Sequence, residues 1–116
     1  MPFNCRRCKL SRIRRCIVSV GGSSPAVAVF ITDAPTAADE RLKRMGRTPQ
    51  ARILSRMVAE AAEMIGIDCP AYQLIPMVFC RPSEPLADTD RAPARDEILA
   101  CVPNVLEAIQ AANPRQ

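Results

Sequence analysis

Four cysteines are the feature that most restricts how this chain can fold. Cys5 and Cys8 form a Cys-x2-Cys pair near its start, whereas Cys80 and Cys101 lie far along the sequence. A Cys-x2-Cys pair can hold one metal from a single turn of backbone. If Cys80 and Cys101 complete the ligand set, distant parts of the chain must meet around the same centre. The cysteines therefore predict a small fold that is closed by a metal site.

The six cysteines in 116 residues allow three explanations. They could form a secreted disulfide framework, remain free buried thiols, or bind a metal or iron–sulfur centre. The first residues carry no apolar run of the kind found in secretory signals, and no segment approaches the ~20 apolar residues that span a bilayer. A thiolate centre in a reducing compartment fits these observations best, and we expect a cytoplasmic protein.

The cysteine spacing and the absence of histidine bear on the kind of centre. Zinc ribbons and fingers normally repeat the tight pair, whereas here the second pair is widely separated. Wide, unequal spacing without histidine favours a [4Fe–4S] cluster, with zinc as the alternative. Cys16 and Cys69 are left over, and we expect both to be small buried residues. The predicted ligands are Cys5, Cys8, Cys80 and Cys101.

The amino-terminal segment is strongly basic, although the net charge of the chain is only +4. No acidic residue precedes Asp33. Arginine presents a planar fork of donors that suits bidentate contact with phosphate. A dense basic segment around a thiol pair favours nucleic-acid binding over a merely solvated surface. The arginines that we expect to contact nucleic acid are Arg6, Arg7, Arg12, Arg14, Arg15 and Arg81.

Two apolar runs predict an α/β fold with a short parallel sheet. Ala26–Ile31 has the composition of a buried parallel strand. Tyr72–Phe79 predicts a second strand, in which Pro76 argues for an edge position or a bulge. The proline-rich residues 81–94 are expected to form a loop. A sheet of two strands is thin, so we predict a single domain, 1–116, with a partial three-layer αβα arrangement, truncated or completed by a partner.

Two helices are predicted around the second strand. The first begins at Pro49 with Thr48 as its cap, continues with apolar residues at three- and four-residue spacing, and ends at Gly66. The second covers roughly Ala94–Ala112, where Pro103 predicts a kink or a restart. Both helices carry an apolar side that a sheet could bury.

Several short motifs follow one another in a characteristic order. They are Cys5-x2-Cys8-x-Leu10, a strand running into Ala34-Pro35, Gly46-Arg47 before a helix, Cys80-Arg81-Pro82, and Glu97-Ile98 ahead of Cys101. In this order they resemble the iron–sulfur uracil-DNA glycosylases of families 4 and 5. The similarity covers nearly all of this chain and about the first half of that family's domain. It implies a structural [4Fe–4S] cluster near a DNA-binding surface, and a uracil pocket at the strand ends.

Residue by residue, the resemblance implies an incomplete uracil site. The family's Gly-Glu-Ala-Pro-Gly turn corresponds to Thr32–Thr36, which puts Asp33 in the place of the water-activating acid of family 4. The family's Phe, which stacks on the flipped uracil, corresponds to a position within Lys43–Gly46, where this chain has no aromatic ring. The Asn that reads the uracil edge corresponds to Pro76, and the His-Pro motif lies in the half that is absent.

Base excision requires an enzyme to flip a base, stack on it, read its edge and stabilise the leaving group. We therefore expect a glycosylase-like [4Fe–4S] DNA-binding protein of the DNA repair class that does not excise bases on its own. One alternative is an active glycosylase with Asp33 as its base, completed by another chain or segment. Another is a zinc-stabilised adaptor without a nucleic-acid role. An open sheet edge would also favour a homo-oligomer or a partner chain.

Overall fold

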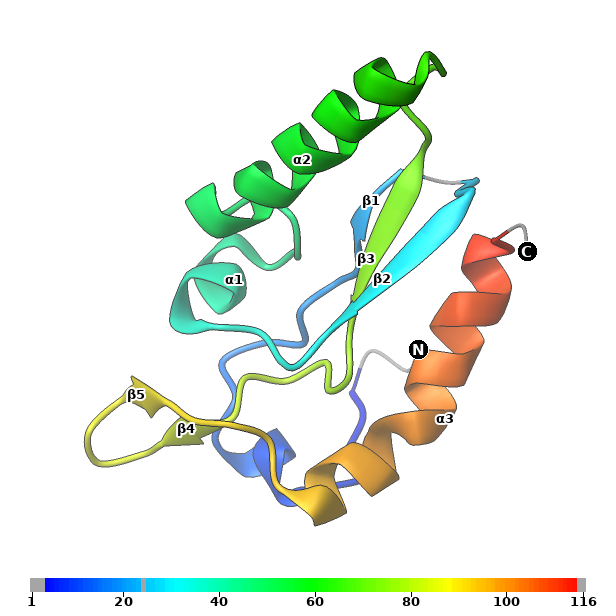
Figure 1. The fold of residues 1–116 in the computed structure, drawn as a ribbon. Coiled ribbons are helices and arrows are strands. Elements are labelled where there is room, and N and C mark those ends of the chain that lie inside the picture. Colours follow the sequence, from blue (N-terminus) through cyan, green and yellow to red (C-terminus); the bar gives the residue numbers. More distant parts are fainter. Residues whose placement is uncertain (1–3, 24, 115–116) are drawn as a thin grey trace.

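The computed structural model describes residues 4–23 and 25–114 (Figure 1). Ser24 of a predicted loop and both ends of the predicted domain lie outside the described residues. Three strands form one sheet in the order β1-β3-β2, in which β2 and β3 are parallel and β1 is antiparallel to β3. Two further strands form a separate antiparallel hairpin. The strands are β1 (Gly21–Gly22), β2 (Ala28–Thr32), β3 (Tyr72–Pro76), β4 (Ser83–Glu84) and β5 (Thr89–Asp90).

The helices lie on both sides of the sheet. Figure 1 shows α1 and α2 on one side and α3 on the other. The predicted α/β class is confirmed, with a sheet that is short and mixed rather than purely parallel. The helices are a 3-10 turn (Lys9–Arg12), α1 (Ala37–Leu42), α2 (Pro49–Ile65) and α3 (Arg95–Ala112).

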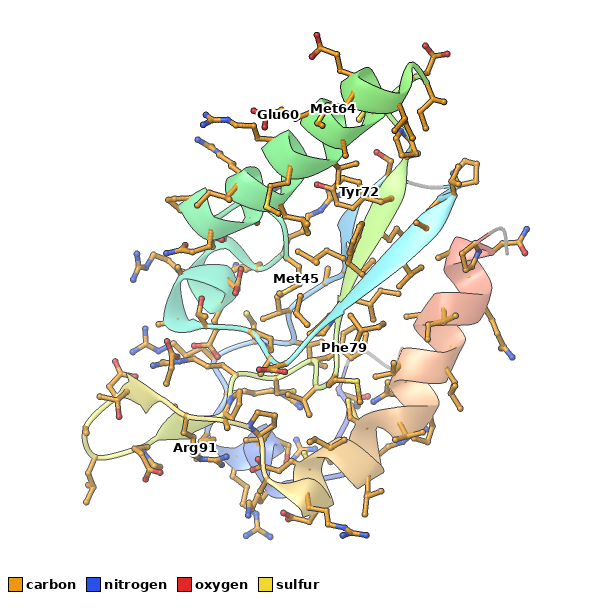
Figure 2. All side chains as sticks on the ribbon, viewed as in Figure 1. Met45, Glu60, Met64, Tyr72, Phe79 and Arg91 are labelled. Carbon is orange, nitrogen blue, oxygen red and sulfur yellow. The ribbon has the colours of Figure 1, made fainter. Side chains whose placement is uncertain are left out.

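Two neighbouring residues of β3 divide the core between the two faces of the sheet. Leu74 packs with Val18 and Met45 on the side of α2, whereas Ile75 belongs to the larger cluster that includes Val105 of α3. Successive side chains of a strand point to opposite faces, so this division follows from the strand itself. Met45 lies between α2 and the sheet in Figure 2, and Phe79 lies on the side of α3.

The bounds of α2 agree with the prediction. The Thr48 hydroxyl accepts a hydrogen bond of 3.2 Å from the Ala51 amide, and Pro49 occupies the first helical position. Gly66 ends the helix with a φ of 75°, a left-handed conformation that glycine adopts without a Cβ penalty. These signals are local to the helix, so the sequence alone could predict them.

Pro76 does not mark an edge strand, because β3 is the central strand of the sheet. The Met77 amide donates to the Thr32 carbonyl across the β2–β3 pair, at 2.8 Å. Successive backbone nitrogens point to opposite sides of a strand, so the Pro76 nitrogen faces the side of β1. There β1 pairs only as far as Leu74, and no ladder hydrogen bond is lost.

Three further features differ from the expectations. Pro103 lies inside one continuous helix, so the predicted restart is wrong. The predicted loop 81–94 contains the β4–β5 hairpin. The short α1 was not expected, since its six residues are too few for an apolar period; it begins with a capping box between Thr36 and Asp39.

Candidate metal centre

The four cysteines predicted as ligands line one small cavity of about 10 Å³. Cys5 and Cys8 precede the 3-10 turn, Cys80 follows β3, and Cys101 lies in the second turn of α3. Cys80 and Cys101 are buried, whereas Cys5 and Cys8 are half-buried. The structure therefore brings together thiols from distant parts of the chain.

Leu10 fixes the Cys-x2-Cys segment against the rest of the protein. Its side chain is fully buried in the same core cluster as Cys80 and Cys101. The Leu10 carbonyl accepts hydrogen bonds from the amides of Ile13 and Arg14, at 3.2 and 2.9 Å. Burial of a leucine side chain contributes about 2 kcal/mol. This apolar contact holds the amino-terminal thiols beside the carboxyl end of β3.

Nitrogen donors point at three of the four sulfur atoms. The Asn104 amide lies 3.4 Å from Sγ of Cys101 and 3.8 Å from Sγ of Cys5. Arg14 donates through one nitrogen to Sγ of Cys80, at 3.5 Å, and to the Cys5 carbonyl, at 2.6 Å. Such donors stabilise negative charge on sulfur. Asn104 and Arg14 would therefore stabilise negative charge on these sulfur atoms.

Burial opposes the ionisation of these thiols when they carry no metal. Desolvation raises the pKa of Cys80 to about 11, against the opposing effect of Arg14. Desolvation also raises the pKa of Cys8. Metals bind the thiolate form, so binding at this site would release protons.

Among residues 4–23 and 25–114, no group of three or more His, Cys, Asp or Glu side chains stands ready to hold a single metal ion. The residues that line the cavity with the cysteines are apolar or carry nitrogen and hydroxyl groups. All six cysteines are free thiols, and none forms a disulfide. Cys69 is exposed and Cys16 half-buried, so the expectation that both are buried is wrong.

The arginines of the amino-terminal segment fall into two groups. In the first group, Arg7 donates to the Asn104 side chain at 3.1 Å, and Arg14 donates to Sγ of Cys80 at 3.5 Å. In the second group, the side chains of Arg6 and Arg12 are exposed and make no hydrogen bond or ion pair with any residue that the structure describes. Arg15 is exposed, with a loose contact of 3.7 Å to a carboxylate. Arg6, Arg12 and Arg15 are therefore the arginines of this segment that are open to a phosphate.

Arg81 differs from the other predicted contacts. Its side chain is only 4% exposed. It donates to the Asp90 carboxylate at 2.7 Å, to the Asp88 carboxylate at 2.8 Å and to the Asp88 carbonyl at 3.0 Å. Hydrogen bonding to Arg81 also lowers the pKa of Asp88. We therefore correct the prediction for Arg81: its guanidinium stabilises the β4–β5 hairpin and has no free edge for DNA.

Asp33 lies where the sequence predicts it, in the turn after β2. Its side chain is exposed and has no hydrogen bond or ion pair with another described residue. Of the segment Lys43–Gly46, the residues from Arg44 onwards line a groove of about 610 Å³ on the α2 side, together with Tyr72. Asp33 does not line that groove. The structure therefore does not bring the candidate acid and this groove together.

Two residues near the cysteines were not among the predicted site residues, although Glu97 belongs to one of the motifs of the resemblance. Glu97 is fully buried and accepts two hydrogen bonds from Arg91, at 2.8 and 2.7 Å, and one from the Ala94 amide, at 2.7 Å. Asn104 is buried three residues after Cys101. Residues three apart share one face of a helix, so this spacing was a signal that could have identified Asn104.

None of the helices in the described part of the chain combines the length and the apolar composition needed to cross a bilayer.

No family model matches the chain. Three curated relatives do, and each is named a type-4 uracil-DNA glycosylase.

The relative from Saccharolobus solfataricus is 29% identical over 110 residues, which are 95% of this chain and 47% of the relative. The relative from Pyrobaculum aerophilum is 26% identical over 97% of this chain and 53% of its own length. The relative from Sulfurisphaera tokodaii is 27% identical over 97% of this chain and 48% of its own length. The chain thus spans about half the length of these relatives. The predicted resemblance is confirmed: over that half, this chain is similar to type-4 uracil-DNA glycosylases.

Proposed function

We propose that this chain is a uracil-DNA glycosylase-like protein that binds DNA and carries a [4Fe–4S] cluster. The observation that carries the proposal is the convergence of four cysteines on one cavity, in a chain whose relatives are type-4 uracil-DNA glycosylases. We take residues 1–116 as a single domain of this type, acting in DNA repair in the reducing cytoplasm. The proposed cluster ligands are Cys5, Cys8, Cys80 and Cys101.

The donor set supports a cluster over a single zinc ion. A tetrahedral zinc site places its sulfurs about 3.8 Å apart, because each Zn–S bond is about 2.3 Å. Among the described residues, the cavity is lined by four cysteines and by no histidine or carboxylate. In a [4Fe–4S] cluster each thiolate binds a different iron, so the sulfurs stand further apart. The nitrogen donors of Asn104 and Arg14 suit the negative charge of such a cluster.

The cluster would act mainly as a cross-link. Its ligands would come from the amino-terminal segment, the residues after β3, and α3. When bound, it would fix these three parts of the chain relative to one another. The exposed arginines Arg6 and Arg12, which flank Cys8, would then be presented on a rigid segment. We propose that Arg6, Arg12 and Arg15 contact DNA phosphates, whereas Arg7 and Arg14 contact Asn104 and Cys80.

We propose further that this chain does not excise uracil on its own. The candidate base, Asp33, is an isolated exposed carboxylate among the described residues. The position of the uracil-reading Asn is occupied by Pro76, which ends β3. Losing a base-stacking ring costs about 1–3 kcal/mol of recognition, and losing an edge reader costs a similar amount. Both losses fall on the step that selects the base.

A second candidate function is an active glycosylase completed by another chain or segment. The observation that favours it is the outer edge of β2, which has no pairing strand among the described residues. Phe30 and Ile31 on this strand are 37% and 44% exposed. An uncovered apolar edge strand is a surface onto which a further strand could pair. The partner could be a second copy, another protein or the remaining half of such a domain.

Three measurements on anaerobically purified protein test the proposal. If the protein carries a [4Fe–4S] cluster, it should be brown, absorb at about 400 nm and contain about four irons per chain. A colourless protein with zinc would instead support a zinc-stabilised adaptor. If the arginines contact DNA phosphates, the affinity of the protein for DNA should fall steeply as the salt concentration rises. Arg12→Gln should reduce that salt dependence, with Arg56→Gln on α2 as the matched control. Uracil release from single-stranded and mismatched DNA at high protein concentration would overturn the lack of activity.

A further inference from the structure

Asn104 has an unusual position for a helical asparagine. Its side chain is only 1% exposed and lies among the thiols rather than at a helix end. Asparagine disfavours the helix interior, and a buried amide costs free energy unless its hydrogen bonds are satisfied. In this protein, a buried apolar residue at the same position would pack against the core without that cost. The presence of an amide therefore calls for a specific partner.

The partners of the Asn104 amide are the thiols themselves. Its nitrogen contacts Sγ of Cys101 at 3.4 Å and Sγ of Cys5 at 3.8 Å. These two cysteines belong to opposite ends of the chain. One side chain thus bridges the α3 thiol and an amino-terminal thiol.

Arg7 fixes the direction in which the amide points. Its guanidinium donates to Oδ1 of Asn104 at 3.1 Å. Arginine has donors and no acceptor, so it must face the oxygen of the amide. The NH2 group is consequently turned towards the sulfur atoms. The orientation follows from the chemistry of the two partners.

We infer that Asn104 is a positioning residue for the cluster ligands, an inference that rests on the proposed [4Fe–4S] centre. Its amide fixes the positions of the Cys5 and Cys101 sulfurs relative to each other and donates to them when they are anionic. Hydrogen bonds to cluster sulfurs stabilise the reduced, more negative state more than the oxidised state. Asn104 therefore raises the midpoint potential of the cluster and slows its loss.

Two substitutions separate the amide donors from the other properties of the residue. Asn104→Asp keeps the size of the side chain and an oxygen for Arg7, but it removes the donors to sulfur. Asn104→Leu removes both groups with a similar volume and suits the apolar surroundings, so it supplies the test where a buried aspartate prevents cluster uptake. Leu106→Gln, at an exposed site on the same helix, is the matched control.

The readouts are the midpoint potential, from redox titration followed by electron paramagnetic resonance, and the rate of cluster loss in a chelator. We expect a more negative potential in both Asn104 variants and a loss rate raised about 10-fold, as for outer partners of metal ligands. The control should match the wild type. Unchanged potential and loss rate in both iron-loaded variants would overturn this inference alone. A wild-type protein without iron would overturn the proposed cofactor and, with it, the inference.

Discussion

α2 and α3 are nearly equal in length, at 17 and 18 residues, and lie on opposite faces of one sheet (Figure 1). α3 buries Cys101 and Val105 in the main core. On α2, by contrast, Ile53, Met57 and Met64 are 59%, 60% and 86% exposed, and Figure 2 shows Met64 near the far end of that helix. Both helices have apolar residues at helical spacing, so amphipathicity alone does not decide burial.

The difference between the two sides comes from what else contributes to each core. On the α3 side, the amino-terminal segment and the residues after β3 add Leu10, Val78 and Phe79. On the α2 side, the sheet offers Leu74 and the two-glycine strand β1. The core on the α3 side, which includes the thiols, is thus completed by parts of the chain that are distant in sequence. The α2 side and the edge of β2 present apolar surface that a further element could cover.

The largest expected effect on stability is on the α3 side and comes from loss of a proposed cluster ligand. Cys101→Ser should abolish stoichiometric iron binding and cost more than about 4 kcal/mol, as expected when a metal site is lost. Iron content and thermal unfolding measure both effects. Cys69→Ser, at an exposed thiol outside the cavity, should change neither. Full iron content in Cys101→Ser would remove this residue from the ligand set.

A matched isoleucine pair tests the comparison directly. Ile75 is fully buried in the main core, whereas Ile53 on α2 is 59% exposed. Ile75→Ala should cost about 3 kcal/mol, and Ile53→Ala less than about 0.5 kcal/mol. Chemical denaturation of the two variants measures the difference. A large cost for Ile53→Ala would mean that α2 is covered in solution, for instance by a second copy.

The ion pair between the half-buried Arg91 and the fully buried Glu97 predicts a pH dependence for the α3 side. Its hydrogen bonds lower the pKa of Glu97. The stability that comes from this lowered pKa is fully present above the unfolded value of about 4.3 and is lost as pH falls through the folded value. Glu97→Gln should cost about 2 kcal/mol at neutral pH, because it weakens the buried partner bonds.

The measurement for this pair is the free energy of unfolding of the wild type and Glu97→Gln between about pH 7 and pH 3. The difference between the two proteins should shrink on acidification below about pH 4.3. The exposed Glu63→Gln on α2 is the control, and it should run parallel to the wild type. A constant gap for Glu97→Gln would contradict the linkage.

The smallest effect concerns the cap of α2. Thr48→Ala removes the hydroxyl that accepts from the Ala51 amide. We expect a loss of about 1 kcal/mol. Because the packing of α2 is sparse, the loss should appear as faster hydrogen exchange in its first turns rather than in α3. Uniform exchange across both helices would show that the two sides unfold together and would weaken the comparison.

The elements that the sequence predicts well are those with local signals. α2 carries its own cap and terminating glycine, and the Cys-x2-Cys pair is visible without a fold. α1 has a local capping box between Thr36 and Asp39, and the distant Asp90 carboxylate also accepts from the Ala37 amide at 3.0 Å. Its six residues have no period of their own to detect.

The site divides in the same way. The sequence predicts that Cys5, Cys8, Cys80 and Cys101 meet, and they line one cavity; their role as metal ligands stays a prediction. The burial of Arg81 could not be predicted, because its partners Asp88 and Asp90 lie in a segment whose composition indicates only a loop. Long-range pairing of charges follows from the assembled fold and leaves no periodic signal in the sequence.

The most direct test of the central claim is iron and zinc X-ray absorption on the anaerobically isolated protein, combined with the iron content per chain. We expect about four irons per chain, each with sulfur neighbours and short iron–iron distances, as in a [4Fe–4S] cluster on four thiolates. About one zinc per chain with sulfur neighbours at about 2.3 Å, or no bound metal at all, would contradict it.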